Sequence, residues 1–193
     1  SYNISLTEPW LGGRKPNSLT VGGFFNRFGF GQRNTASYQT FKITQFSASL
    51  GTRLKWPDDN FVSSTAINLQ TLDLNNWTSG LFSDAEGNRV TQGTYFNYSL
   101  KQTIARSSVS DPIYPRRGSH VSLSVQLTPP YSLFREDRNY EDLPTEERFR
   151  YLEYHKWRFD ADWYTPISRD EKLVIKLQAK IGAVGYYNRD IGT

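Results

Sequence analysis

Near the end of the chain, two neighbouring segments alternate strictly between apolar and polar residues. The first, WRFDADWY (residues 157–164), has its apolar side chains at Trp157, Phe159, Ala161 and Trp163. The second, LVIKLQAKIGAVGYY (residues 173–187), has them at Leu173, Ile175, Leu177, Ala179, Ile181 and Ala183. A period of two predicts β-strands with two unlike faces. Because charged residues fill the intervening positions, the pattern is typical of transmembrane barrel strands between lipid and a wet lumen.

Composition supports the same fold class. Aromatic residues make up 15% of the chain, which suits girdles at two membrane interfaces. The mean hydropathy of −0.63 resembles that of a soluble protein, as expected when half of every strand is polar. The basic residues behind the net charge of +4 are dispersed, so nucleic-acid binding is not indicated. The absence of cysteine excludes disulfides and thiolate metal sites within this stretch.

The same alternation predicts about eight strands along the whole chain. Besides the two C-terminal segments, they are Tyr2–Trp10, Ser18–Phe28, Tyr38–Trp56, Phe61–Leu72, Thr94–Arg106 and Ser119–Thr128. Phe41 and Ile43 are out of phase with the later apolar residues of their strand, so we expect a bulge near Thr44–Gln45. The pair Gly22–Gly23 suggests a bulge or close packing.

Short and long connections alternate between these strands. Tight turns are expected near Gly12, Pro57, Arg116 and Ser168, and longer polar connections cover residues 29–37, 73–93 and 130–150. This arrangement is typical of outer-membrane barrels, whose long loops face outside. Unpaired strand edges are prohibitive in lipid, so the sheet must close. The chain is therefore either a complete small barrel or a contiguous part of a larger one.

No catalytic, cofactor-binding or metal-binding residue is predicted. His120 and His155 both fall in strands without a nearby nucleophile, and His120 is expected to be a lumenal residue bonded to its neighbours. The run Asp58, Asp59 and Asn60 lacks the later Gly and Glu spacing of a calcium loop and is interpreted as a turn.

Charged and aromatic residues of the strands receive structural roles. Asp160 and Asp162 share a face with Arg158, and we expect them to pair across strands with Lys176 and Lys180 in the lumen. Four tryptophans near strand ends are assigned to the interfacial girdle: Trp10, Trp56, Trp157 and Trp163.

Three turn sequences, in order, resemble those of the BamA-type outer-membrane insertase family. They are TEPWLGGRKPNSL with Glu8, Pro9 and Trp10, then DPIYPRRGS with Tyr114, Pro115 and Gly118, then WYTPISRDEKLVIKLQAKIG with Pro166. Pro115 removes an amide donor where a ladder ends, and Gly118 permits a positive φ. The resemblance covers nearly the whole chain, and the sequences of the turns are most similar to those of BamA from Bacteroidota.

The resemblance implies that residues 1–193 are part of one transmembrane domain, an all-β antiparallel barrel segment matching strands three to ten of a sixteen-stranded barrel. POTRA repeats, the lumenal Val-Arg-Gly-(Phe/Tyr) motif and the lateral-gate strands lie outside this stretch. It implies a non-enzymatic protein of the outer membrane, with long loops extracellular. Its role would be to fold and insert client β-barrel proteins without nucleotide hydrolysis or cofactors. Its partners would be the bilayer, unfolded clients, and accessory lipoproteins or surface proteins.

Two alternatives come from other classes. The chain could form a small passive outer-membrane pore or a surface receptor barrel. It could also be a soluble calycin-like barrel that binds an apolar ligand, in which case the apolar face would point inward and residues such as Lys101 would face solvent.

Overall fold

The structure, a computed structural model, describes residues 1–13, 17–32, 35, 37–78, 90–134, 147 and 149–187. Within these residues eight strands form one antiparallel sheet in chain order. They are β1 (Tyr2–Glu8), β2 (Asn17–Phe30), β3 (Gln39–Arg53), β4 (Phe61–Asn75), β5 (Gly93–Ser107), β6 (Gly118–Leu127), β7 (His155–Pro166) and β8 (Val174–Gly185). Single 3-10 turns occur at η1 (Leu11–Gly13) and η2 (Tyr131–Phe134). None of the helices in the described residues is long or apolar enough to span a bilayer.

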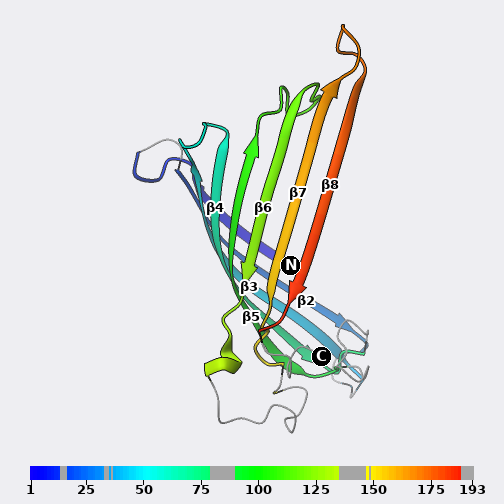
Figure 1. The fold of residues 1–193 in the computed structure, drawn as a ribbon. Helices are drawn as coiled ribbons and strands as arrows, with labels where there is room; N and C mark the ends of the chain where they lie inside the picture. The colour runs from blue at the N-terminus through cyan, green and yellow to red at the C-terminus, as the bar shows by residue number, and fades with distance from the viewer. Residues whose placement is uncertain are drawn as a thin grey trace.

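All eight predicted strands are present, with ends within three residues of the predicted positions. The strand direction turns progressively from β1 to β8, which produces a twisted, curved wall (Figure 1). Among the described residues β1 pairs only with β2, and β8 pairs only with β7. Within the described residues the sheet is therefore an open arc and not a self-closed small barrel.

The connections divide between the two ends of the sheet (Figure 1). At the short-turn end β1 is joined to β2, β3 to β4, β5 to β6 and β7 to β8. At the long-loop end β2 is joined to β3, β4 to β5 and β6 to β7. The four predicted turns all lie at the short-turn end. The alternation of short and long connections is thus confirmed.

One face of the sheet is apolar across all eight strands. In the registers, Phe159 lies opposite Leu123 on β6 and Ile181 on β8. A second apolar row of register partners runs from β6 to β1 through Leu127, Leu100, Ile67, Ala48, Val21 and Leu6. On β4, Ile67 and Leu69 are 51% and 42% exposed, whereas Asn68 and Gln70 between them are half-buried. Greater exposure is expected on the convex side of a curved sheet, so the apolar face points outward. This orientation does not fit the calycin-like alternative, which places apolar residues inside.

A small polar group interrupts the apolar face between β4 and β5. The Thr65 hydroxyl donates to Gln102 Oε1 at 2.5 Å, and Gln102 Nε2 donates to Ser63 Oγ at 2.8 Å. Gln102 stands between the exposed Leu100 and Ile104. Because lipid offers no hydrogen-bond partner, these three side chains satisfy one another instead.

We expect Thr65→Val to destabilise the sheet by about 1–2 kcal/mol, because it leaves Gln102 Oε1 without its donor. The double variant Thr65→Val/Gln102→Leu should recover most of this loss, since both polar groups are replaced. Urea unfolding in lipid vesicles measures both. Equal destabilisation of the single and double variants would contradict the role of the pair.

At the long-loop end the inner face becomes apolar and the outer face becomes charged. Phe41 of β3 lies on the otherwise polar face, where it forms a buried cluster with Leu72, Leu74, Trp77 and Tyr95. Phe28 stacks on Phe41, with ring centroids 5.9 Å apart. On the outer face at this level the side chains are charged, and Lys42 Nζ lies 2.9 Å from Asp73 Oδ2.

The predicted bulge near Thr44–Gln45 is wrong. β3 pairs without interruption with both β2 and β4 from Thr40 to Thr52. Phe41 and Ile43 are out of phase because the strand leaves the apolar band, and the inner face becomes the packed one. No bulge forms at Gly22 either, and a Cβ there would lie 3.4 Å from the Ile4 carbonyl oxygen, which supports the close-packing alternative.

Leu74→Ala should cost about 2–4 kcal/mol, because Leu74 is only 3% exposed and its removal leaves a cavity in the cluster. Leu69→Ala, on the outer face of the same strand, is the matched control. Its cost should be clearly smaller because surrounding lipid fills the space. Denaturant unfolding of the membrane-inserted protein compares the two, and equal losses would argue against a packed inner cluster.

The connection between β6 and β7 returns to the sheet beside β5. Phe96 N donates to Arg150 O at 2.7 Å and Leu152 N donates to Phe96 O at 3.0 Å, where β6 no longer pairs with β5. The buried Glu153 carboxylate accepts hydrogen bonds from the Ser132 amide and hydroxyl, both at 2.6 Å. These contacts fix η2 against the sheet.

Candidate functional site

The inner, polar face carries a hydrogen-bonded network that links β4, β5 and β6 with Tyr154, the residue just before β7. Asn97 Nδ2 donates to Gln70 Oε1 at 3.2 Å, and the Tyr154 hydroxyl donates to Asn97 Oδ1 at 3.1 Å. Gln126 Nε2 is placed to donate to the Tyr154 hydroxyl at 2.9 Å and to Ser99 Oγ at 3.0 Å. A wet lumen accommodates such a network, which holds the wall together across strands.

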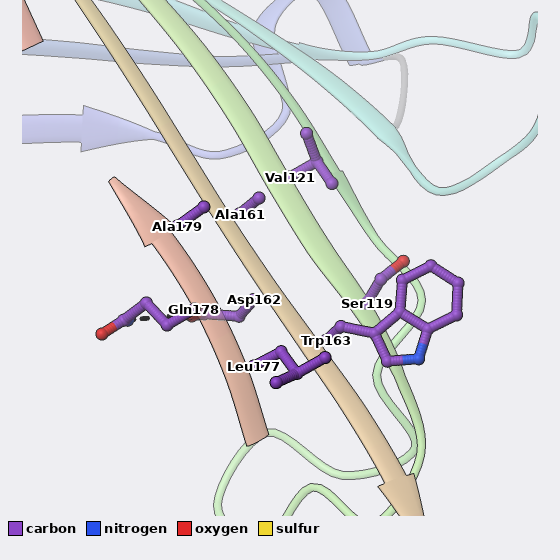
Figure 2. A pocket seen from close by; sticks show the side chains of 8 residues that line it. All are labelled: Ser119, Val121, Ala161, Asp162, Trp163, Leu177, Gln178 and Ala179. Carbon is purple, nitrogen blue, oxygen red and sulfur yellow. Dashed lines mark hydrogen bonds between the residues drawn. The ribbon is translucent and has the colours of Figure 1, made fainter. Parts of the chain in front are cut away.

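Charged side chains follow on β7 and β8. Asp162 pairs with Lys176 at 3.4 Å and accepts a hydrogen bond from Gln178 at 2.7 Å, as the dashed line in Figure 2 marks. This cross-strand pairing confirms the prediction for Asp162. Asp160 instead pairs with Arg158 of its own strand at 2.8 Å, although Lys180 is its register partner.

The opposite face of the same two strands is a shallow apolar depression. Ala161 and Ala179, which are register partners, form its floor, and Trp163 and Leu177 form one end. In Figure 2, Leu177 projects to one side of β8 and Gln178 to the other. Adjacent residues of one strand thus meet two different environments, as the alternation predicts.

The two tryptophans of β7 lie on the apolar face, at either end of its apolar run. Trp157 is 45% exposed and Trp163 is 59% exposed. Each indole N–H is satisfied by the residue two positions toward the strand end: Trp157 by His155 Nδ1 at 3.1 Å, Trp163 by Thr165 Oγ1 at 2.8 Å. An apolar ring with a polar tip suits the membrane interface, in line with the girdle assignment.

The first of the three family-like turns joins β1 and β2. Glu8 ends β1, and its Oε1 accepts a hydrogen bond from the Trp10 amide at 3.1 Å. Pro9 stands between them, and Gly13 N donates to Trp10 O at 2.8 Å. These residues close a turn and form no cluster with the other two motifs, which lie at the far side of the sheet.

The second turn is built around Asp111. Its Oδ1 accepts the amides of Ile113 at 2.7 Å and Tyr114 at 3.0 Å, and these bonds hold the pKa of the carboxyl below its ordinary value. Pro115 follows, and the turn ends at Gly118 with φ +103°. The predicted positive φ at Gly118 is thus confirmed, and a Cβ at this position would also collide with the Ser108 carbonyl oxygen.

The second and third turns come together. Pro166 ends β7 opposite Val174, and the turn beyond it carries Glu171, which forms an ion pair with Arg117 of the second turn. Both turns line one cleft, whose residues include Tyr114, Pro115, Tyr164, Lys172 and Lys176. Sequence reasoning missed the Arg117–Glu171 pair, because only the register of β6 with β7 brings the two turns side by side.

Gly118→Ala should cost about 1–3 kcal/mol, because it imposes both an unfavourable φ and a steric clash. Gly182→Ala is the matched control, since the nearest atom to its Cβ would be the Trp157 carbonyl oxygen at 3.9 Å. Its effect should stay within about 0.5 kcal/mol. Unfolding midpoints of the two variants decide the point, and a tolerated Gly118→Ala would refute the strain argument.

The remaining candidates take part in structure. Asp58 accepts the Asn60 amide at 2.8 Å and pairs with Arg106 at 2.9 Å, as the turn interpretation expects. His120 lies on the polar face as predicted, but no hydrogen bond of its imidazole is found in the described part of the chain. No group of three His, Asp or Glu side chains that could hold a metal occurs among the described residues.

Comparison with known proteins identifies the family. The model of the Omp85 superfamily domain matches residues 1–191. The chain belongs to the Omp85 superfamily. Its fold is similar to the crystal structure of BamA from Haemophilus ducreyi lacking POTRA domains 1–3, with a TM-score of 0.64 and 17% sequence identity. The match covers 96% of this chain and 33% of that one. No curated protein matches the chain significantly.

These findings confirm the predicted resemblance to BamA-type proteins and the barrel-segment fold class. The chain spans about a third of the BamA chain that it resembles. The outward apolar face, the polar inner face and the open edges of this Omp85 segment are the features expected of a piece of barrel wall.

Proposed function

We propose that this chain is the middle wall of an outer-membrane barrel that folds and inserts client β-barrel proteins without nucleotide hydrolysis. The match of the Omp85 model over residues 1–191 carries the proposal. The open eight-stranded arc with an apolar outer face supports it. In this proposal the long loops face outside the cell and the short turns face the periplasm.

The wall contributes rigidity rather than the site of client pairing. β3 pairs with both of its neighbours over nearly its whole length of 15 residues, so its backbone groups are already used. An incoming strand needs an edge with free amides and carbonyls. Within this proposal the client seam therefore lies outside β2–β7, and we place it in strands other than these eight.

The proposed partners follow from the same reasoning. The outer face meets the lipid bilayer, unfolded β-barrel proteins are the clients, and accessory lipoproteins or surface proteins dock at the ends. The assignment to Bacteroidota rests only on the amino-acid sequences of the turns and is part of the proposal.

A passive outer-membrane pore is the second candidate, because the inner face is rich in cations. Lys101, Lys156, Arg158, Lys176 and Lys180 share this face with only two carboxylates of the same strands, Asp160 and Asp162. Such a wall would favour anions in a conducting barrel. An ion channel without insertase activity would support the pore and overturn the insertase.

The insertase proposal predicts that locking the wall leaves client insertion unchanged. Ala66→Cys/Lys101→Cys joins register partners on β4 and β5, and Asp162→Cys/Gln178→Cys does the same on β7 and β8. This stretch has no cysteine of its own. The full-length protein, oxidised in proteoliposomes, should insert an urea-denatured client barrel as fast as the reduced protein does.

Two controls complete this experiment. Empty liposomes give the spontaneous insertion rate, which the full-length protein must exceed if it is an insertase. A loss of insertion on oxidation that reductant restores would show that this wall opens, and would contradict the scaffold role.

A further inference from the structure

A row of polar residues crosses four strands on the outer face at the long-loop end, and the first three of them are charged. Arg27 of β2 lies opposite Lys42 of β3, Lys42 opposite Asp73 of β4, and Asp73 opposite Thr94 of β5. The row stands two residues beyond Phe25 and Phe96 of the apolar face, or about 7 Å along the strands. It therefore borders the apolar band directly.

The two cations of this row are not balanced within it. Directly opposed like charges are destabilising on a sheet, and Arg27 and Lys42 are such a pair. The carboxylate of Asp73 bonds Lys42 at 2.9 Å and accepts the Thr94 hydroxyl at 3.2 Å. Arg27 is exposed, and no partner of its guanidinium is found among the described residues. The row therefore carries one positive charge that an external anion could balance.

An anion can reach this row only from the outer surface, because the inner side of the sheet is packed with side chains here. Behind the row, Phe41, Leu72 and Leu74 are packed in the dry inner cluster. A third cation, Arg150, lies over the Phe96 ring with its guanidinium carbon 5.9 Å from the ring centroid. The cations thus stand just above an apolar surface, as a lipid with an anionic headgroup requires.

We propose that Arg27 and Lys42 bind the phosphate of a phosphorylated glycolipid in the outer leaflet, with its acyl chains along the apolar face below. The inference rests on the proposed orientation with the long loops outside. Arginine and lysine form charge-assisted hydrogen bonds to phosphate oxygens, and arginine can do so with two parallel donors. The exposed rings of Phe25 and Phe46 offer the acyl chains a surface beneath the site.

Retention of lipid A by the full-length protein tests the site. The protein is placed in nanodiscs with bis-phosphorylated lipid A, and the lipid that stays bound is measured by native mass spectrometry. Arg27→Gln/Lys42→Gln should lower the bound fraction by roughly fivefold for each cation removed. Arg106→Gln is the matched control, because this cation of the outer face lies at the short-turn end and already pairs with Asp58. Its retention should be unchanged.

Asp73→Asn separates lipid binding from a purely structural role. It frees Lys42 from its carboxylate and should raise lipid A retention, whereas loss of a structural ion pair would lower it or leave it unchanged. Arg27→Lys, which keeps the charge, should retain most of the binding and also checks that the variants fold.

Three outcomes would overturn the assignment: unchanged retention in Arg27→Gln/Lys42→Gln, reduced or unchanged retention in Asp73→Asn, or equal retention of phosphatidylglycerol in place of lipid A. The last outcome would mean a site for any anionic lipid. Client insertion is measured on the same samples. Loss of insertase activity with intact lipid A binding would count against the proposed function alone.

Discussion

The pairing of backbone amides in an apolar solvent governs this structure. Lipid supplies no donor or acceptor, so every N–H and C=O in the apolar band must find a partner in a neighbouring strand. The uninterrupted registers of β2 with β3 and of β3 with β4 satisfy that demand. The same demand reaches the side chains: Gln102 bonds Thr65 and Ser63, and the indole of Trp163 bonds Thr165. Among the described residues β1 and β8 are the edges of the sheet, where one side of each strand has no such partner.

The environment of each face of the sheet changes along the strands. Through the apolar band the outer face is apolar, and the inner face carries the Gln70–Asn97–Tyr154 network. At the long-loop end the inner face is packed around Phe41 and Leu74, and the outer face carries Lys42 and Asp73. The position of this exchange marks where the strands leave the membrane.

Sequence periodicity is sufficient to predict a strand and its two faces when each face meets the same environment along the whole strand. β7 and β8 alternate without a break, and their pairing follows the prediction closely. It misleads at β3, because Phe41 and Ile43 keep the strand register while the environment around the strand changes. A period of two reports which side chains share a face, but not which solvent that face meets.

Contacts between turns are harder to predict from a sequence than the structure within one turn. The roles of Asp111 and Gly118 are local, and their turn chemistry can be recognised from residue type and spacing. The Arg117–Glu171 pair and the choice of Arg158 as the partner of Asp160 depend on register and side-chain rotamers across the sheet. The family turns at Glu8 and at Tyr114 are similar in kind, yet the sheet holds them far apart.

The central claim is that an apolar outer face of this wall meets lipid while the inner face meets water. Single cysteines placed in turn from 157 to 163 on β7, in the full-length protein in membranes, test it most directly. Spin labels at positions 157, 159, 161 and 163 should be accessible to oxygen dissolved in lipid, and those at 158, 160 and 162 to a water-soluble nickel complex. An accessibility profile without a period of two, or with the two faces reversed, would contradict the account.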